Sequence, residues 1–251
     1  LGANEIAIAI ELEAQKRKLE IELIRNGSRG LFWLEPLVEV VHKGNRIAYG
    51  PIIEEDVKSL FDSKFYEGGQ HDKYLGKTDE IAWLKNQERL TFARVGITDP
   101  LSLKDYLDHE GFVGLKKAVN FEPQKIVDEV KDSGLRGRGG AAFPTGIKWQ
   151  TVLDTQSSQK YIVCNADEGD SGTFSDRMIM ENDPFLLIEG MIIAGLAVNA
   201  DHGYIYLRSE YPHALDVLNK AIKIAEENNY LGKNILNSNK NFTLEVRRAA
   251  G

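Results

Sequence analysis

The first part of the chain carries the pattern of a small domain with both helices and strands. Residues 3–18 are rich in Ala, Glu and Lys, which favours a helix, and residues 21–25, IELIR, are strand-like. Apolar positions alternate through residues 37–50 on both sides of a Lys-Gly-Asn turn, which predicts a β-hairpin. A short helix is predicted at residues 54–61. We therefore expect a first α/β domain over residues 1–65.

A polar stretch follows, and we expect it to connect two domains. Residues 66–120 begin with Gly68 and Gly69, which favour turns. One short helix is predicted around Trp83, and two more are predicted on either side of Gly111. No repeat or low-complexity tract accompanies these short elements, so the stretch is interpreted as a connector with short helices.

Strands and helices alternate in the last part of the chain. A helix over residues 122–134 is predicted with Pro123 in its first turn and Gly134 just past its end, the usual placement of these two residues. After it, the apolar runs predict a strand at 160–166, a helix at 182–201, a strand at 204–208, a helix at 211–230 and a strand at 242–248. Such alternation predicts a mostly parallel sheet covered by helices, here over residues 121–251.

Composition and charge narrow the range of partners. The chain is 42% hydrophobic and 27% charged, enough apolar residues for a core, and its formal net charge is -7. An acidic balance argues against electrostatically driven nucleic-acid binding, which needs a basic face. The longest apolar run, residues 185–200, is interrupted by Glu189 and is too short to cross a bilayer. We expect no nucleic-acid partner and no membrane span.

The single cysteine, Cys164, limits metal and redox chemistry. One thiol forms no internal disulfide and cannot by itself hold a structural zinc ion or an iron–sulfur cluster. No metal site is therefore predicted, and a reducing, cytoplasmic location is the simplest interpretation. The chain starts at Leu1 without a methionine, so we expect the natural N-terminus to lie further upstream.

The most unusual stretch is residues 133–149, SGLRGRGGAAFPTGIKW. Glycines let main-chain N–H groups approach a phosphate with no Cβ in the way, and Lys148 adds a positive charge. Residues 137–142 fit G-x-G-x-x-A, but a helix rather than a strand precedes them, which departs from the dinucleotide-binding context. Phe143 could stack on a base. The alternative is a glycine-rich surface turn with Phe143 packed into the core.

Together with three later segments, this stretch resembles one family. The segments are YIVCNADEGDSGTFSDR at 161–177, DPFLLIEGMIIAGLAV at 183–198 and GYIYLRSEYP at 203–212. They resemble the NADH-oxidising, FMN-carrying subunits: the 51-kDa subunit of respiratory complex I, the diaphorase subunit of NAD-reducing hydrogenases and the β subunit of NAD-dependent formate dehydrogenases. The resemblance runs from about residue 126 to 251. It implies a Rossmann-like FMN- and NADH-binding α/β domain.

The family resemblance assigns roles to individual residues. It implies that FMN is held by Gly137, Arg138, Gly139, Lys148, Asn165, Asp167 and Glu168. It implies that NAD(H) is contacted by Phe143, Lys148 and Asp170. The flavin carries the chemistry, hydride transfer with nicotinamide, so no side chain is assigned as an essential catalyst, although Glu168 and Asp170 are candidates for tuning the flavin. The alternative interpretation of NADEGD is an exposed acidic turn.

The beginning of the chain carries a second resemblance. NGSRGLFWLEPLVEV, residues 26–40, resembles a thioredoxin-like ferredoxin domain. Where such domains bind a 2Fe–2S cluster they have cysteines at positions that here are Ser28 and Phe32, so a clusterless domain is expected. With residues 47–52, IAYGPI, included, the likeness is greatest to the formate dehydrogenase β subunit, which implies partner subunits with iron–sulfur clusters and molybdenum or tungsten. An unrelated α/β domain is the alternative.

The C-terminal end departs from the family pattern. Family members continue with a second glycine-rich element containing Gly-Glu-Glu-Thr and with cysteines for a 4Fe–4S cluster, and neither is present by residue 251. We therefore expect the flavin domain to be incomplete here and the cluster to lie in the missing part. The alternatives are the same subunit of an NAD-reducing hydrogenase or of complex I, a non-catalytic assembly fragment, and another kind of nucleotide-binding module.

Overall fold

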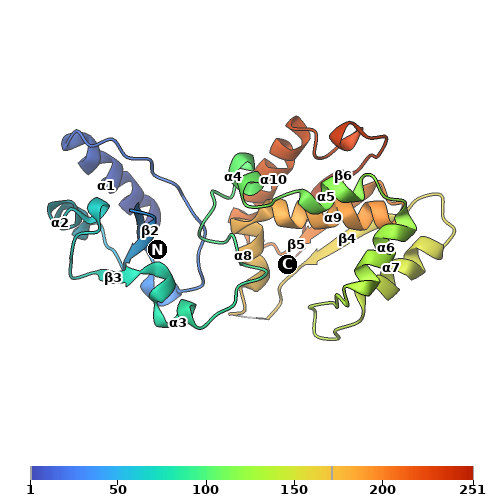
Figure 1. The fold of residues 1–251 in the computed structure, drawn as a ribbon, viewed down its shortest axis with the longest axis horizontal. Helices are drawn as coiled ribbons and strands as arrows, with labels where there is room; N and C mark the ends of the chain where they lie inside the picture. Colours follow the sequence, from blue (N-terminus) through green and yellow to red (C-terminus); the bar gives the residue numbers. More distant parts are fainter. Residues whose placement is uncertain (1, 171, 251) are drawn as a thin grey trace. The chain divides into compact units, whose positions relative to one another are not determined.

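The computed structural model describes residues 2–170 and 172–250 and divides the chain into two compact units (Figure 1). The first unit is Leu1–Ala93 and the second is Arg94–Gly251. The stretch interpreted as a connector, residues 66–120, is shared between them. Its first part completes the fold of the first unit, and its last part packs into the core of the second.

The first unit is a three-stranded antiparallel sheet with helices. Its helices are α1 (Ala3–Lys16), α2 (Asp56–Asp62) and α3 (Ala82–Lys85), with 3-10 turns η1 (Phe32–Leu34), η2 (Phe65–Glu67) and η3 (Thr78–Glu80). Its strands are β1 (Val38–His42), β2 (Asn45–Tyr49) and β3 (Tyr74–Lys77), in the order β1-β2-β3. Figure 1 shows these elements in blue to blue-green. The thioredoxin-like character of this unit stays a prediction.

Two strand assignments of the first unit differ from the sequence-based expectation. The predicted hairpin is confirmed, since Val38 pairs with Tyr49 and His42 with Asn45. The expected strand at residues 21–25 is wrong: the segment is irregular, and its apolar Ile24 is exposed instead of entering a sheet. The third strand is β3, which is short and interrupted by Gly76 at a positive φ of 87°, features that hide a strand in a sequence.

The second unit is built around a parallel sheet. Its helices are α4 (Leu103–Asp108), α5 (Val113–Ala118), α6 (Pro123–Asp132), α7 (Thr145–Asp154), α8 (Ser175–Asn182), α9 (Pro184–Val198) and α10 (Pro212–Glu227), with the 3-10 turn η4 (Ile235–Asn237). Its strands are β4 (Tyr161–Ala166), β5 (His202–Leu207) and β6 (Thr243–Arg248), in the order β4-β5-β6 with parallel pairing throughout. The predicted parallel α/β domain is confirmed.

Helices of the described residues pack against one face of this sheet. Ile205 and Leu207 on that face are fully buried beneath the apolar helix α9. Helix α9 comes so close that a Cβ on Gly195 would lie 2.3 Å from the ring of Phe242. On the opposite face, alternate side chains such as Val163 are exposed. This explains why β4 has an alternating rather than a fully buried pattern.

A buried carboxylate fixes the short helices of the second unit to α9. Glu189 accepts hydrogen bonds from the Tyr106 hydroxyl at 2.6 Å and from the N–H groups of Phe112 and Leu115 at 2.8 and 2.9 Å. The last two satisfy main-chain donors at the start of α5. Glu189 therefore interrupts the apolar run of α9 for a structural reason: it ties α4 and α5 to the core.

Candidate functional site

The glycine-rich loop, residues 135–145, and the acidic segment, residues 165–170, belong to the same edge of the parallel sheet. The acidic residues 167–170 follow β4 directly, at its carboxyl end. Helix α7 leads through residues 155–160 into the amino end of β4, so the start of α7 and the loop before it return toward the carboxyl end (Figure 1). Open α/β sheets bind their ligands at this edge.

The glycine-rich loop is closed at its base by main-chain hydrogen bonds. The N–H of Gly137 donates to the carbonyl of Phe143 at 2.9 Å, and the N–H of Thr145 donates to the carbonyl of Leu135 at 2.9 Å. Residues 138–142 form the tip, and all of them are exposed. The loop is therefore a short projection with a fixed base rather than an unstructured linker.

The glycines of this loop are not explained by the packing of the protein itself. Gly137 and Gly139 have no positive φ, so their backbone conformation is open to other residues. A Cβ on Gly139 would meet no heavy atom of the described chain within 4 Å. Only Gly140, with φ of 94°, is required by conformation. A missing side chain in open space is what a close approach by a ligand would require.

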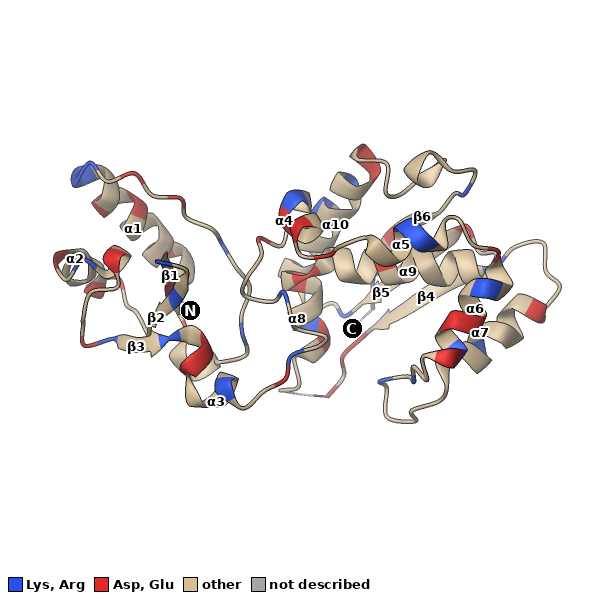
Figure 2. Cartoon of the chain, viewed as in Figure 1, with Lys and Arg blue, Asp and Glu red and all other residues tan. Residues whose placement is uncertain are grey.

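The charge around the loop suits an anion. Arg136, Arg138 and Lys148 are exposed, and no ion pair joins any of them to a carboxylate within residues 2–170 and 172–250. Figure 2 shows the basic residues of the loop beside α7. Helix α7 has no side-chain cap, and the N–H groups of Gly146 and Ile147 have no hydrogen-bond acceptor among the described residues. Free first-turn N–H groups and cations attract phosphate.

Phe143 lies at the end of this loop with its side chain 51% exposed. The alternative in which Phe143 is packed into the core is therefore wrong, since Phe143 belongs neither to the buried cluster of the second unit nor to the side chains packed against it. An exposed ring beside a cationic loop is free to stack on a planar ligand. Its role in binding the adenine stays a prediction.

Glu168 has a different environment from the rest of the candidate residues. It is 7% exposed, and its carboxylate accepts four hydrogen bonds. These come from the Ser175 hydroxyl at 3.0 Å, the Asp176 N–H at 3.0 Å, the Arg177 N–H at 3.3 Å and the Tyr211 hydroxyl at 3.2 Å. Burial by itself raises the pKa of Glu168, but these hydrogen bonds outweigh it and hold the pKa below its usual value. The carboxylate thus caps α8 from outside the helix.

The other acidic-segment residues are open to solvent. Asn165, Asp167 and Asp170 are exposed, and the Asn165 side-chain oxygen accepts the N–H of Asp167 at 3.1 Å. No hydrogen bond or ion pair among the described residues joins this segment to the glycine-rich loop. The structure brings the predicted residues to one edge of the sheet as two groups. The assignments of each to FMN or NAD(H) stay predictions.

Two residues at this edge were not singled out from the sequence. Arg208 and Tyr211 follow β5, and both reach the segment after β4: Arg208 donates to the main-chain carbonyl of Glu168, and Tyr211 donates to its carboxylate. Both lie in a stretch recognised only as part of a motif. The sequence signal that could have identified them is their position just after a predicted parallel strand, where ligand-binding loops cluster.

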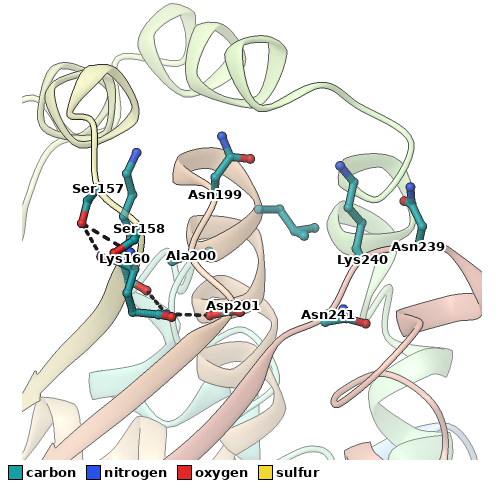
Figure 3. Close-up of a pocket in the computed structure, with 12 residues that line it drawn as sticks. Ser157, Ser158, Lys160, Asn199, Ala200, Asp201, Asn239, Lys240 and Asn241 are labelled. Carbon is teal, nitrogen blue, oxygen red and sulfur yellow. Dashed lines mark hydrogen bonds between the residues drawn. The ribbon is translucent and has the colours of Figure 1, made fainter.

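A polar cavity of about 220 Å³ lies at the amino end of the sheet, opposite the candidate residues. It is bounded by the segment before β4, the C-terminus of α9 and residues 239–241 (Figure 3). Gln159 donates to the carboxylate of Asp201 there at 2.8 Å, and Lys160 donates to the carbonyl of Leu153. Gln159 and Lys160 therefore already have partners within the protein, and none of the residues predicted from the sequence to bind FMN or NAD(H) lines this cavity.

The remaining features add no metal or membrane element. Among the described residues, no three His, Cys, Asp or Glu side chains converge as metal ligands. Within the same residues, no helix is both long and apolar enough to cross a bilayer. Burial, with a smaller contribution from the charge of Asp176, raises the pKa of the Cys164 thiol to about 11, so the thiol stays protonated at neutral pH.

Fold and site together define a cofactor-binding α/β domain with a glycine-rich loop at the carboxyl edge of a parallel sheet. Comparison with known families gives a closer assignment. Residues 130–251 match the family model described as the Nuo51 FMN-binding domain. This part of the chain belongs to that family, which comprises the 51-kDa NADH-binding FMN subunits.

Several curated proteins are similar to the chain over the same region. It is 48% identical over 167 residues to NADP-reducing hydrogenase subunit HndC of Solidesulfovibrio fructosivorans, covering 66% of this chain and 34% of that protein. It is 48% identical over 150 residues to an NADH-quinone oxidoreductase subunit of Aquifex aeolicus, covering 60% of this chain and 35% of that protein. It is 46% identical over 154 residues to the corresponding NADH-quinone oxidoreductase subunit of Escherichia coli, covering 61% of this chain and 35% of that protein. The match thus spans about a third of the length of each relative.

One solved structure is similar over almost the whole chain. A chain of the NAD+-reducing NiFe hydrogenase in the air-oxidised state matches with a TM-score of 0.50 and 23% identity, covering 98% of this chain and 40% of that one. At this identity the likeness concerns the fold alone. It extends over both units and agrees with the mixed α/β architecture expected from the sequence.

Proposed function

We propose that this chain forms part of an NAD(H):FMN oxidoreductase subunit, a diaphorase, and that its glycine-rich loop binds FMN. The observation that carries the proposal is the empty space at Gly139 beside three exposed cations and the uncapped start of α7. When bound, FMN would supply hydride exchange with the nicotinamide of NAD(H). Family membership and the names of the relatives support the same assignment.

The residues of the chain fit a phosphorylated, planar cofactor. The missing side chains at Gly137 and Gly139 let a ligand come close to the main chain, where the N–H of Gly139 has no acceptor among the described residues. The cations Arg138 and Lys148 would balance the ligand's negative charge. The exposed Phe143 would stack on the adenine of the nicotinamide nucleotide. Each of these groups binds or orients; none transfers a proton.

The acidic segment supplies the remaining polar contacts in this proposal. Asn165 and Asp167 are exposed at the end of β4, where an amide and a carboxylate can bind hydroxyl groups of the flavin side chain. Asp170 would lie toward the nicotinamide ribose. Glu168, whose four hydrogen bonds stay within the protein, supports the segment and places a fixed negative charge near the flavin.

The parent assembly is a further part of the proposal. The resemblance of residues 25–40 and 47–52 favours the β subunit of a cytoplasmic formate dehydrogenase, in which a molybdenum or tungsten subunit handles formate and iron–sulfur clusters carry electrons. Since residues 1–251 contain one cysteine, any 4Fe–4S cluster of the subunit lies outside them. The alternative assembly is an NAD-reducing hydrogenase or complex I, which the hydrogenase and NADH-quinone oxidoreductase relatives favour.

Gly139→Ala tests the flavin site without disturbing the fold. A methyl group there meets no protein atom, so stability is expected to stay unchanged while the affinity for FMN falls by about tenfold or more. Gly190→Ala is the matched control, because Gly190 is exposed in α9 and its Cβ also meets open space. FMN is titrated into the full-length apoprotein by quenching of flavin fluorescence. Equal FMN affinity in both variants would contradict the proposed site.

The assembly is tested separately by purifying the native complex through this subunit. Formate-dependent reduction of NAD by the purified complex would support a formate dehydrogenase. Hydrogen-dependent reduction without formate activity would identify a hydrogenase instead. Neither outcome alters the FMN titration, so the site and the assembly can be judged independently.

A further inference from the structure

The side chain of Tyr211 lies near two cationic side chains and one carboxylate. Its ring centroid lies 5.5 Å from the guanidinium carbon of Arg177 and 5.8 Å from that of Arg208. Its hydroxyl donates to Glu168 at 3.2 Å, and the side chain is almost fully buried. The ring is thus restrained by both cations, which fixes the direction in which the hydroxyl points.

Arg208 fixes the main chain of the same segment. The guanidinium of Arg208 donates to the main-chain carbonyl of Glu168. The main-chain N–H of Arg208 donates to the carbonyl of Ala166 at 3.2 Å and so continues the pairing of the sheet. Glu210 accepts from this guanidinium at 3.3 to 3.4 Å and helps to orient it. Glu168 is therefore held at its carbonyl by one residue and at its carboxylate by another, both from the connection after β5.

The consequence concerns the neighbours of Glu168 in the chain. Asp167 and Asp170 are exposed on either side of it and have no ion-pair partner among the described residues. Their positions depend on the main chain at Glu168, since the segment leaves β4 only one residue earlier. Fixing that residue limits the conformations of the whole segment before any ligand arrives, which lowers the entropy cost of binding.

We propose that Tyr211 and Arg208 are positioning residues that hold residues 167–170 in the conformation that binds the flavin nucleotide. This inference rests on the proposed function. Neither residue needs to touch the ligand, because each acts through Glu168. The ionised carboxylate is the form that accepts the two N–H groups of α8 and the Tyr211 hydroxyl, so the segment is expected to lose its shape when Glu168 is protonated.

The pH dependence of FMN binding separates this role from a merely structural one. Tyr211→Phe keeps the ring but removes a donor to Glu168, so protonation of Glu168 becomes easier and the loss of FMN affinity on acidification moves to higher pH. Asp176 and the main-chain N–H of Arg177 also face this carboxylate, and the guanidinium of Arg208 donates to the main-chain carbonyl of the same residue. The pKa of Asp176 is raised by its burial and by the charge of Glu168, so Asp176→Asn is included to exclude its titration as the cause.

The experiment measures FMN affinity of the full-length protein by flavin fluorescence between pH 7.5 and 3.5, a range that includes the lowered pKa of Glu168. Tyr211→Phe is expected to weaken binding about fivefold at pH 7.5, with the acid limb displaced upward by about half a pH unit, also in the Asp176→Asn background. Tyr230→Phe is the matched control: Tyr230 is similarly buried, and its hydroxyl has no hydrogen-bond partner among the described residues. It is expected to bind as the unmodified protein does.

Three results would overturn the inference. Tyr211→Phe could match Tyr230→Phe at every pH, it could weaken binding by the same factor at every pH, or the displacement could vanish with Asp176→Asn. If Tyr211→Phe fails to fold, Arg208→Lys takes its place, since it keeps a cation but loses the planar fork, and unchanged FMN affinity would then overturn the inference. Failure of the unmodified protein to bind FMN would refute the proposed function itself and be visible as such.

Discussion

Two helices start at the carboxyl edge of the parallel sheet, and their first turns differ. At α8, the carboxylate of Glu168 accepts the N–H groups of Asp176 and Arg177, so the helix start is closed by the protein. At α7, the N–H groups of Gly146 and Ile147 have no acceptor in the described part of the chain, and the preceding loop carries glycines and cations. The first-turn N–H groups of α8 thus have an acceptor within the protein, whereas those of α7 remain available to a ligand.

The difference shows which half of the site is built for a ligand and which half supports it. A carboxylate at a helix start contributes through hydrogen bonds and the helix dipole, so Glu168 stabilises the folded chain. The unpaired N–H groups of α7 and the cations of the loop have no such partner within the described chain and are left to water or to a ligand. The open start of α7 is therefore consistent with an external anion as its partner, and the two regions should respond to mutation in opposite ways.

The largest expected effect is on stability at the closed helix start. Glu168→Ala leaves four donors without an acceptor and should lower the free energy of unfolding by about 3 kcal/mol. Urea unfolding of the full-length protein followed by circular dichroism measures it. Glu181→Ala, which removes only a partly exposed ion pair of α8 with Arg177, is the control and should cost less than about 1 kcal/mol. Equal losses would remove the distinction between the two helix starts.

The next effect is on binding at the open helix start. Lys148→Met removes a cation that has no ion-pair partner among the described residues, so it should weaken FMN binding about tenfold and change stability by less than about 0.5 kcal/mol. Fluorescence titration and urea unfolding report the two quantities. Lys116→Met makes the same charge change on α5 and should leave FMN affinity unchanged. Loss of stability without loss of affinity would show that Lys148 has a structural role instead.

Acidification should act on the closed helix start alone. The pKa of Glu168 is lowered on folding, so its stabilising contribution is present above its usual value of 4.5 and is lost as the pH falls through the lower folded value. The difference in unfolding free energy between the unmodified protein and Glu168→Gln should stay constant from pH 8 to about 5.5 and shrink as the pH falls below 4.5. A difference independent of pH would mean that the carboxylate charge contributes nothing.

The smallest effect comes from closing the open helix. Pro144→Asp supplies the missing N-cap of α7, which should raise the free energy of unfolding by about 0.5 to 1 kcal/mol. The same carboxylate should repel an anion at this position and lower FMN affinity. Pro144→Ala, with no capping group, is the control for loss of the ring. Increased stability with unchanged FMN affinity would show that the first turn of α7 is not used by the ligand.

The sequence predicted much of this arrangement because its main signals are local. Pro123 and Gly134 mark the ends of α6, and the apolar runs predicted β4, β5 and β6 in the right order along the chain. Helix α8 was not predicted, because its first turn is stabilised by Glu168 from seven residues away rather than by its own N-cap residue. A contact between residues distant in the chain does not change the pattern of hydrophobic and polar positions from which helices are predicted.

The candidate site was predicted to a similar extent and for similar reasons. The glycines of residues 137–140 and the exposed Phe143 were identifiable from residue type. The burial of Glu168 was not, since an acidic run gives no indication of which carboxylate turns inward. Arg208 and Tyr211 were missed because their partner lies about 40 residues earlier in the chain and is joined to them only through the pairing of β4 with β5.

The most direct measurement is an experimental structure of the full-length subunit with FMN bound. The account predicts that ligand atoms lie within hydrogen-bond distance of main-chain N–H groups in residues 138–140 or at the start of α7, with Lys148 facing the flavin nucleotide. It also predicts that the carboxylate of Glu168 keeps its contacts with α8. Finding FMN elsewhere, or finding the space at Gly139 filled by the protein's own side chains, would contradict the central claim.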